Sequence, residues 1–390
     1  MLFKRITAAI LTAALTMAAF TGLSASAKST AADKEKEVRG VWLSVYDYGY
    51  SGIGLSTDSE TVFRKNADRF ISRMKQYKLN TIYMQVRSND DAAWRSSTFP
   101  AMKELSPYVS SLARNGKNTA AAKKTLKFDP LSVMTEEAHK NDVDLIAWMN
   151  PYRCYRNNKS KYPTMYFLDP QASGSINRVV KAVKEVMAYG VDGVVFDDYF
   201  YHSTNGYWND SKKKVTLSTA QAAKLPRAKK AANVNKLVRK VYSTVKACNK
   251  NATFGISPQG NLDNDMASGA DVKTWASVDG YVDYIMPQIY WTDDYGKKGG
   301  TTMFSDRLSQ FTSKSLDKKG KIKYIALALY RCGYANALDQ GWKSSDTNLA
   351  DQYEALKEAG CKGYSLFSAK FLYIGKAEDE LGYLNESIVG

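Results

Sequence analysis

The chain has few of the residues on which metal centres and disulfide frameworks depend. Its 390 residues include four cysteines and two histidines, His139 and His202. Four widely separated cysteines are too few for a disulfide scaffold, and they lack the spacing of a zinc site. Two histidines exclude a multi-histidine metal centre, and a histidine-dependent catalytic triad would have to use one of them. We therefore expect no bound metal.

Long hydrophobic runs are also missing, except near the N-terminus. Residues 6–23 are mostly apolar, follow Lys4 and Arg5, and lead to small residues that end at Ala27. This order is typical of a cleavable secretory signal peptide. An uncleaved membrane anchor is the alternative, but threonines interrupt the run, and no later stretch is long enough to span a membrane. The expected organisation is a signal peptide at 1–27, a short linker at 28–36 and one domain at 37–390, in a protein secreted or associated with the cell envelope, outside the cytoplasmic membrane.

The charge balance is strongly basic. The net charge is +16, and removal of Lys4 and Arg5 with the signal peptide lowers it by two, to +14. A basic protein outside the cytoplasmic membrane attracts polyanions, so anionic wall polymers are candidate partners. The lysines and arginines are scattered, and the chain carries no nucleic-acid-binding motif or basic face. Nucleic acid is therefore not an expected partner.

Short apolar runs alternate with amphipathic stretches along the chain. Near-continuous apolar runs are typical of parallel strands that are covered on both faces. The pattern predicts one (β/α)8 TIM barrel in the α/β class. No glycine-rich GxGxxG turn follows the first run, so a dinucleotide cofactor is not expected. Strands are expected at residues 38–45, 81–87, 145–150, 193–197, 253–257, 284–290, 324–330 and 363–368, and helices at 59–77, 130–141, 175–189, 234–248, 303–316 and 348–359.

Two connections are longer than the others. Residues 88–128 follow the second expected strand, and residues 202–230 follow the fourth. In a barrel of this kind both would leave the carboxyl ends of strands, where the loops that build active sites lie. We expect these long loops to cover the functional face.

Two adjacent carboxyl groups end the fourth expected strand. Asp197 and Asp198 follow the apolar residues Val194, Val195 and Phe196. Burial and a neighbouring charge would perturb the pKa of such a carboxyl, which makes it a catalytic candidate. A helix cap or a salt bridge to an arginine is the structural alternative. Because side chains alternate along a strand, Asp197 points into the barrel if Val195 does.

Polar and aromatic residues follow the other expected strands. A flat aromatic ring next to carboxylate and amide groups suits a pyranose ring, which offers C–H groups on its face and hydroxyls at its edge. With two carboxyl groups and no cofactor motif, glycoside hydrolysis by an acid with a nucleophile or base is the reaction that fits. The substrate-binding candidates are Arg87, Asn150, Tyr152, Tyr199, Ser257, Gln288, Tyr290, Trp291 and Tyr330.

The strand blocks resemble those of a known family, the glycosyl hydrolase-like family 10 of bacterial envelope proteins. The resemblance covers roughly residues 37–375. It implies a (β/α)8 fold, export to the envelope and glycosidase activity on a polysaccharide, with cell-wall peptidoglycan as the leading substrate. The matching blocks are Arg39–Trp42, Asn80–Arg87, Trp148–Arg153, Asp192–Phe200, Phe254–Pro258 and Val282–Trp291.

The chain departs from the family pattern after the second strand. Similar proteins often read Arg-Pro-Glu-Gly-Asp-Ala there, whereas this chain has Asn89 at the position of the glutamate. Asp90 or Asp91 could replace the missing acid, and Asp91 therefore joins Asp197 and Asp198 as a catalytic candidate. The loss also supports an alternative function, a cell-wall glycan-binding protein without turnover on a glycosidase barrel. Whether hydrolysis would retain or invert the anomeric configuration stays open.

The signal-peptide hypothesis predicts the N-terminus of the exported protein. When a bacterium expresses the full chain, the protein recovered from its envelope or medium should begin at Lys28, because the small residues before it suit signal peptidase. Intact-mass measurement and N-terminal sequencing test this. Exported protein that still carries Lys4 and Arg5 would contradict the hypothesis and support the membrane anchor.

Overall fold

Contacts divide the chain into the units Met1–Lys36 and Glu37–Gly390, and the second unit holds the folded domain described below. The computed structural model describes residues 36–115, 122–157, 164–202, 205–208 and 214–389. The expected signal peptide and nearly all of the expected linker lie outside these residues.

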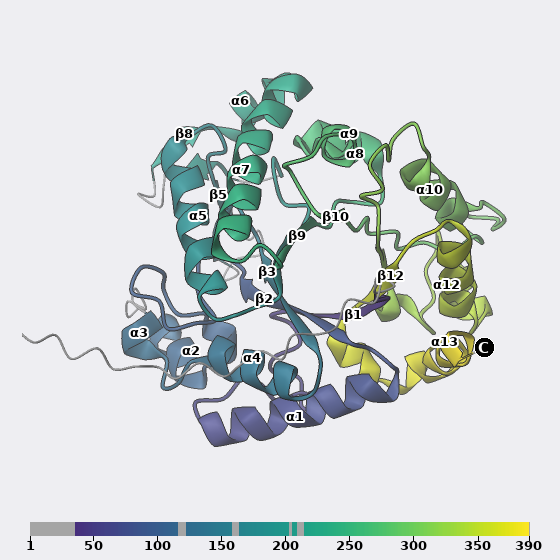
Figure 1. Ribbon diagram of the computed structural model, residues 1–390, viewed down its shortest axis with the longest axis horizontal. Coiled ribbons are helices and arrows are strands. Elements are labelled where there is room, and N and C mark those ends of the chain that lie inside the picture. Colours follow the sequence, from purple (N-terminus) through teal and green to yellow (C-terminus); the bar gives the residue numbers. More distant parts are fainter. Residues whose placement is uncertain (1–35, 116–121, 158–163, 203–204, 209–213, 390) are drawn as a thin grey trace, which may run out of the picture. The chain divides into compact units, whose positions relative to one another are not determined.

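Eight parallel strands form one curled sheet at the centre of the domain (Figure 1). All eight coincide with strands expected from the apolar runs, so the predicted α/β barrel-type fold is confirmed. In their order across the sheet, the strands are β10 (Tyr284–Ile285), β9 (Thr253–Ile256), β6 (Gly193–Phe196), β3 (Asp144–Met149), β2 (Thr81–Arg87), β1 (Val38–Leu43), β12 (Gly363–Phe367) and β11 (Ile325–Leu327).

The two ends of the sheet, β10 and β11, meet through isolated contacts. Parallel bridges join Ile285 to Ile322 and Gln288 to Ala326. The backbone N–H of Ala326 donates to the carbonyl of Pro287 over 2.9 Å, and the N–H of Ile289 donates to the carbonyl of Ala326 over 3.0 Å. The barrel therefore closes here with fewer ladder hydrogen bonds than between its other strands.

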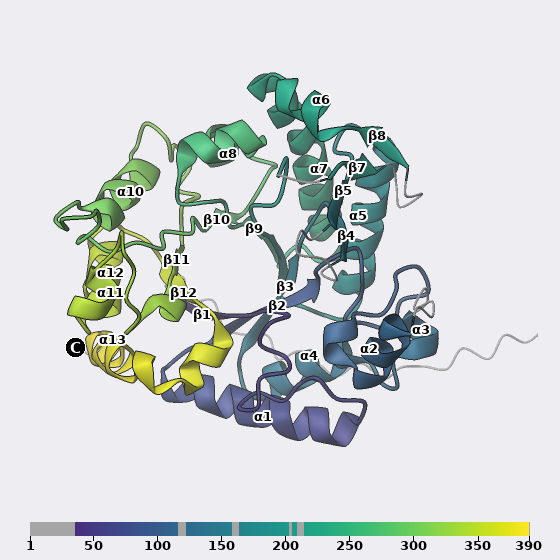
Figure 2. The same ribbon diagram turned by 180° about the vertical axis from the view of Figure 1, so that it is seen from behind.

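Helices surround the curled sheet, as Figures 1 and 2 show from opposite sides. The six expected helices are present, although α7 begins seven residues earlier than its apolar pattern indicated. The main helices are α1 (Glu60–Gln76), α4 (Pro130–Lys140), α5 (Ser173–Met187), α7 (Arg227–Cys248), α8 (Leu262–Ser268), α9 (Val272–Ser277), α10 (Met303–Thr312), α12 (Asn348–Glu358) and α13 (Glu378–Val389).

Local sequence explains where several helices begin. The Ser59 side chain accepts a hydrogen bond from the backbone N–H of Val62 at the start of α1. The Asp129 side chain accepts one from Ser132, and Pro130 occupies the first position of α4. Both patterns satisfy backbone donors that a helix leaves free at its N-terminus.

The connections after β2, β3 and β6 contain further elements. The connection after β2 folds into η1 (Lys103–Leu105), α2 (Pro107–Arg114) and α3 (Ala122–Thr125). Those after β3 and β6 together form a second, four-stranded sheet. Its strands are β4 (Arg153–Asn157), β5 (Thr164–Leu168), β7 (Tyr207–Trp208) and β8 (Val215–Leu217). The remaining short helices of the described residues are α6 (Thr219–Lys224), α11 (Gly341–Ser344), η2 (Leu329–Arg331), η3 (Ala369–Tyr373) and η4 (Gly375–Ala377).

Large side chains fill the barrel interior. They form a cluster separate from the apolar layer between sheet and helices. Gly255 in β9 leaves the space that the Tyr284 ring occupies, because a Cβ atom on residue 255 would overlap that ring. The interior cluster consists of Trp42, Tyr83, Ile146, Trp148, Val195, Tyr284, Met286, Tyr324 and Ala326.

This packing predicts a stability loss for Gly255→Ala. Overpacking a filled interior typically costs about 1–3 kcal/mol, and urea unfolding should show a loss of that size. Gly382→Ala is the matched control, since nothing lies within 4 Å of a Cβ added in α13. The free energy of unfolding of the control should rise by about 0.5–1 kcal/mol, because alanine is a better helix former than glycine. Equal stability of Gly255→Ala and the wild type would show that the interior can move the Tyr284 ring aside.

Candidate active site

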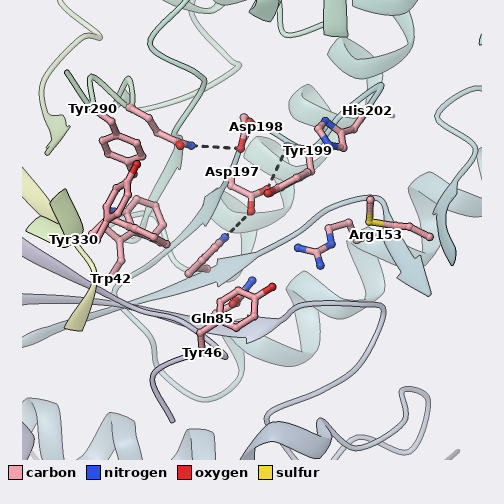
Figure 3. A pocket seen from close by; sticks show the side chains of 14 residues that line it. Trp42, Tyr46, Gln85, Arg153, Asp197, Asp198, Tyr199, His202, Tyr290 and Tyr330 are labelled. Carbon is pink, nitrogen blue, oxygen red and sulfur yellow. Dashed lines mark hydrogen bonds between the residues drawn. The ribbon is translucent and has the colours of Figure 1, made fainter. Parts of the chain in front are cut away.

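A cavity of about 420 Å³ lies among residues at the carboxyl ends of the strands (Figure 3). Barrel enzymes assemble their active sites at this end, because loops and strand ends from around the ring converge there. The volume falls within the range of small-molecule sites. The lining residues are Trp42, Tyr46, Gln85, Trp148, Arg153, Met165, Asp197, Asp198, Tyr199, His202, Gln288, Tyr290, Tyr330 and Phe367.

Asp197 is the most deeply held of the lining carboxyl groups, with 3% of its surface exposed. Val195 lies in the barrel interior, and Asp197, two residues later, points the same way. The Asp197 carboxylate accepts hydrogen bonds from the Trp148 indole over 3.0 Å and from the Asn150 side-chain amide. A third, longer bond of 3.4 Å comes from the backbone N–H of Tyr199. All these donors favour the ionised carboxylate.

A chain of hydrogen bonds fixes the orientation of the Asn150 amide. The side-chain N–H of Gln85 donates to the Asn150 oxygen over 2.6 Å. The Gln85 oxygen in turn accepts from the backbone N–H of Val45 over 3.0 Å. Because the Asn150 oxygen is already engaged, its NH2 group faces Asp197. Residues at or just after the ends of β1, β2 and β3 thus orient one hydrogen-bond donor towards the Asp197 carboxylate.

Asp198 also lines the cavity, although alternation along a strand would turn it away from Asp197. The strand β6 ends at Phe196, so the alternation no longer applies at residues 197 and 198. One Asp198 oxygen accepts a 3.4 Å hydrogen bond from the side-chain amide of Gln288. That amide also donates to the Ser257 carbonyl over 3.0 Å. Asp198 therefore receives weaker hydrogen bonding than Asp197.

Burial raises the pKa of both carboxyl groups above the ordinary aspartate value. The negative charge of Asp198 raises the pKa of Asp197 further, while Arg153 and the hydrogen bond from Trp148 oppose the rise. Two carboxyls that interact in this way titrate as a pair and hold one proton to a higher pH than separate groups would. One protonated and one ionised carboxyl is the arrangement that acid and nucleophile or base chemistry needs.

His202 stands next to this pair. Burial lowers the pKa of its imidazole, and the positive charge of Arg153 acts in the same direction, while Asp198 opposes the shift. Its ring packs edge to face against Tyr199, with 5.0 Å between the ring centres. We therefore expect a neutral imidazole at neutral pH.

Aromatic rings form another part of the cavity wall. The rings of Tyr290 and Tyr330 pack edge to face, with centroids 5.8 Å apart. The Phe367 ring also packs against Tyr330, with ring centres 5.9 Å apart, and contacts the interior cluster of the barrel. Tyr46, on the loop after β1, is 64% exposed at the cavity. Such surfaces suit the C–H face of a sugar ring.

The structure brings part of the predicted site together. The cavity is lined by Asp197, Asp198, Tyr199, Gln288, Tyr290 and Tyr330 from the predicted set. Asn150 lies directly behind the cavity, where it holds Asp197. The other predicted residues, Asp91, Arg87, Tyr152, Ser257 and Trp291, do not belong to the lining.

Arg87 and Asp91 have partners in the turn after β2. The Arg87 guanidinium forms an ion pair with Asp90 and donates to the carbonyl of Asn150. The Asp91 carboxylate accepts from the backbone N–H groups of Ser88 and Asn89, over 2.7 and 2.9 Å. Both side chains therefore stabilise the turn.

The remaining predicted residues lie in packed surroundings. Tyr152 is buried against Phe200, with 6.4 Å between ring centres. Ser257 is buried, and its carbonyl orients the Gln288 amide. Trp291 packs against the apolar layer, and its carbonyl accepts from Gln352 over 3.0 Å. These residues support the site from outside the cavity.

Several lining residues were not expected from the sequence patterns. Trp42, Trp148 and Phe367 belong to apolar strand cores, so nothing in the sequence separates them from ordinary core residues. Arg153 and Met165 belong to the β4–β5 hairpin, which the sequence analysis did not predict. Both its strands are short, and the hairpin gains its partners only from β7 in a distant part of the chain.

The described residues contain no group of three or more histidine, cysteine, aspartate or glutamate side chains that could hold a metal ion. All four cysteines are free thiols. None of the helices in the described ranges combines the length and the apolar character of a membrane span.

Comparison with known proteins agrees with the geometry. Glycosyl hydrolase DigH of Escherichia coli O6:H1 is 25% identical over 410 residues, which cover 91% of this chain and 88% of that protein. Glycosyl hydrolase YngK of Bacillus subtilis is 26% identical over 353 residues, which cover 81% of this chain and 64% of that protein. Both relatives are thus distant in sequence but similar over most of the domain.

Solved structures support the fold alone. An alpha-L-fucosidase isoenzyme 2 from Paenibacillus thiaminolyticus has a TM-score of 0.51 at 14% identity and covers 90% of this chain and 49% of that one. A family GH18 chitinase from Cycas revoluta has a TM-score of 0.50 at 9% identity and covers 90% of this chain and 99% of that one.

The sequence motifs carry a resemblance that the family comparison also finds. The family described as glycosyl hydrolase-like 10 matches residues 156–344, from the β4–β5 hairpin to α11. This range includes the Asp197–Asp198 pair and most of the cavity lining. Over these residues the chain is similar to the glycosyl hydrolase-like 10 family.

Proposed function

We propose that this protein hydrolyses a glycosidic bond in a bacterial cell-wall glycan of the peptidoglycan type. The observation that carries the proposal is the pair of adjacent carboxyl groups, Asp197 and Asp198, in one cavity with aromatic walls. Most glycosidases use a pair of carboxyl groups that lie in different environments. The names of the relatives, which are called glycosyl hydrolases, support the same reaction class.

The hydrogen bonds support different roles for the two carboxyls. Asp197 accepts from Trp148 and Asn150, so it is the ionised group that acts as nucleophile or stabilises an oxocarbenium-like transition state. Asp198 has the weaker hydrogen bonding, so it holds the proton that the pair shares. It gives this proton to the leaving glycosidic oxygen as the bond breaks. Water then supplies a hydroxyl to the anomeric carbon and a proton to the carboxyl pair.

The place of action is part of the same proposal. The signal-peptide pattern of residues 1–27 supports secretion or retention at the cell envelope. The net charge of +14 that remains after loss of Lys4 and Arg5 supports attraction to anionic wall polymers, which would concentrate the enzyme near the glycan. A cell-wall substrate is consistent with both.

Product analysis tests the reaction. The chain from Lys28 onward is incubated with purified peptidoglycan, both intact and stripped of its peptides, and the soluble products are separated and weighed by mass spectrometry. New reducing ends on sugar fragments support hydrolysis. Binding to both preparations without any product supports a non-catalytic glycan-binding protein, the alternative that Asn89 at the family's glutamate position favours.

Replacement of Asp197 tests the catalytic assignment. Asp197→Asn keeps the size and most hydrogen bonds of the side chain but removes the charge that the reaction needs. Turnover should fall by at least about 1,000-fold, while glycan binding and the melting temperature change little. Asp293→Asn is the control, because Asp293 is an exposed carboxylate outside the cavity lining. Near wild-type turnover by Asp197→Asn would show that the assignment is wrong.

The raised pKa values also predict how stability depends on pH. A carboxyl whose pKa is higher in the folded than in the unfolded state stabilises the fold fully below its unfolded pKa of about 4. That contribution is lost as the pH rises through the folded pKa. Asp198→Asn removes one carboxyl of the pair, so the fold no longer holds the shared proton to a higher pH. The variant should therefore lose less stability than the wild type between pH 4.5 and pH 8, by about 1 kcal/mol.

Urea unfolding at the two pH values measures this difference. The control is Asp263→Asn, since Asp263 is exposed and its hydrogen bond with Arg227 lowers its pKa instead of raising it. That control should show no relative gain at pH 8. An Asp198→Asn variant that also shows none would mean that the two cavity carboxyls do not share a raised pKa.

A further inference from the structure

The residues that line the cavity include one lysine or arginine side chain, that of Arg153. It begins β4, directly after the segment that follows β3, and its guanidinium points towards the cavity in Figure 3. Only 8% of its surface is exposed. Its Nε atom is buried and has no hydrogen-bond partner, and none of the described carboxylates forms an ion pair with it. A buried guanidinium in this state is costly unless another group pairs with it.

A neighbouring arginine shows the contrast. Arg87 is also buried, but its guanidinium pairs with Asp90 and donates to the backbone carbonyls of Asn150 and Pro151. Arg178 pairs with the same Asp90 over 2.8 Å. These two guanidinium groups have carboxylate partners inside the protein. Among the described residues, Arg153 is therefore a buried cation without a carboxylate partner at ion-pair distance, and Glu104 interacts with it only through longer-range charge.

The geometry leaves the hydrogen-bond donors of Arg153 available. Its guanidinium carbon lies 5.0 Å from the centre of the Tyr199 ring, close enough for a cation–π contact. Such a contact attracts the positive charge to the face of the ring and provides no oxygen acceptor for the N–H donors. The ring holds the cation in position without using those donors.

The two cavity aspartates do not serve as this partner. Asp197 is bonded to Trp148 and Asn150, and Asp198 to Gln288, with no hydrogen bond from Arg153 to either. Arg153 acts on Asp197 through longer-range charge and lowers its pKa. Space for a ligand group therefore remains at the guanidinium.

We propose that Arg153 binds the carboxylate of an acidic sugar residue next to the bond that is cut. The inference rests on the proposed function and adds the class of substrate, a glycan in which some residues carry a carboxylate. A planar guanidinium can hold a carboxylate through two parallel hydrogen bonds. A single cation with a neutral His202 beside it suits a group of one negative charge better than a doubly charged phosphate.

The arrangement in the cavity also gives the glycan a direction. In Figure 3 the rings of Trp42, Tyr290 and Tyr330 lie on one side of the carboxyl pair, and Arg153 and His202 lie on the other. A glycan that crosses the pair would place a neutral sugar on the aromatic side. Its acidic sugar would then lie on the side of Arg153.

The experiment compares two matched ligands. Peptidoglycan glycan strands stripped of their peptides carry carboxylates on their sugars, and reduction of these groups to alcohols gives neutral strands of the same length. Binding is measured by calorimetry in an Asp197→Asn background, so that it does not depend on turnover. Arg153→Met and Arg153→Lys are compared with Arg227→Met, which removes the same charge from an exposed arginine that pairs with Asp263.

The carboxylated strands should bind at least about 10-fold more tightly than the reduced strands. Arg153→Met should abolish this preference by weakening only the carboxylated ligand, and Arg153→Lys should retain part of it, because lysine keeps the charge but not the planar fork. Arg227→Met should behave like the parent. Melting temperatures show whether each variant is folded.

Equal binding of both strands by the parent would overturn the inference, and so would an equal loss for both ligands in Arg153→Met. The latter result would show that Arg153 only balances the charge of the aspartates. The proposed hydrolysis is tested separately with the wild-type chain. Turnover of both strands at equal rates would leave hydrolysis standing without the acidic-sugar site, whereas selective binding without turnover would leave the site standing without hydrolysis.

Discussion

The burial of two adjacent carboxyl groups at the end of one barrel strand is the constraint on which the functional end of this protein depends. A carboxylate as enclosed as Asp197 is stable only if donors replace the water that it loses. The Trp148 indole and the Asn150 amide supply those donors. Gln85 and the backbone of Val45 then determine which way the amide faces. Side chains from β2 and from the end of β3, with a backbone N–H from the loop after β1, thus stabilise one charge just after β6.

The parallel barrel is what brings these residues together around Asp197. Parallel strands end at a common rim, so residues far apart in the chain reach the same few ångströms without long irregular segments. The interior below the rim is filled by Trp42, Trp148, Val195 and other large side chains, which keeps water away from the carboxyl pair from beneath. The packing of the interior and the raised pKa values therefore have a common origin.

The insertions add what the barrel alone does not provide. The β4–β5 hairpin contributes Arg153 and Met165 to the cavity, and the connection after β6 contributes His202. The hairpin is held by pairing with β7, so two connections that follow different barrel strands stabilise each other. The insertions thus place a cation beside two acids, while the aromatic residues come mainly from the barrel rim.

Much of the fold could be predicted from the sequence because barrel strands and helices carry strong local patterns. Continuous apolar runs identified all eight strands, and the pair Asp129-Pro130 marked the start of α4. The Asp197–Asp198 pair could be selected because it directly follows such a run. Asp91 was harder to interpret, since a carboxylate that caps its own turn and one that faces a cavity look alike in sequence. Its bonds to the N–H groups of Ser88 and Asn89 became visible only in the structure.

The sequence by itself determined the order of strands and helices and the acids at the end of the fourth strand, because these follow from local apolar patterns and strand geometry. Only the tertiary structure decided that Asp197 and Asp198 share one cavity, since that depends on β6 ending at Phe196. It also decided which arginine faces the cavity. Arg87 is the last residue of β2, and Arg153 is the first residue of β4. Arg87 pairs with Asp90, whereas Arg153 lines the open cavity. Such partners come from long-range packing, which no local pattern records.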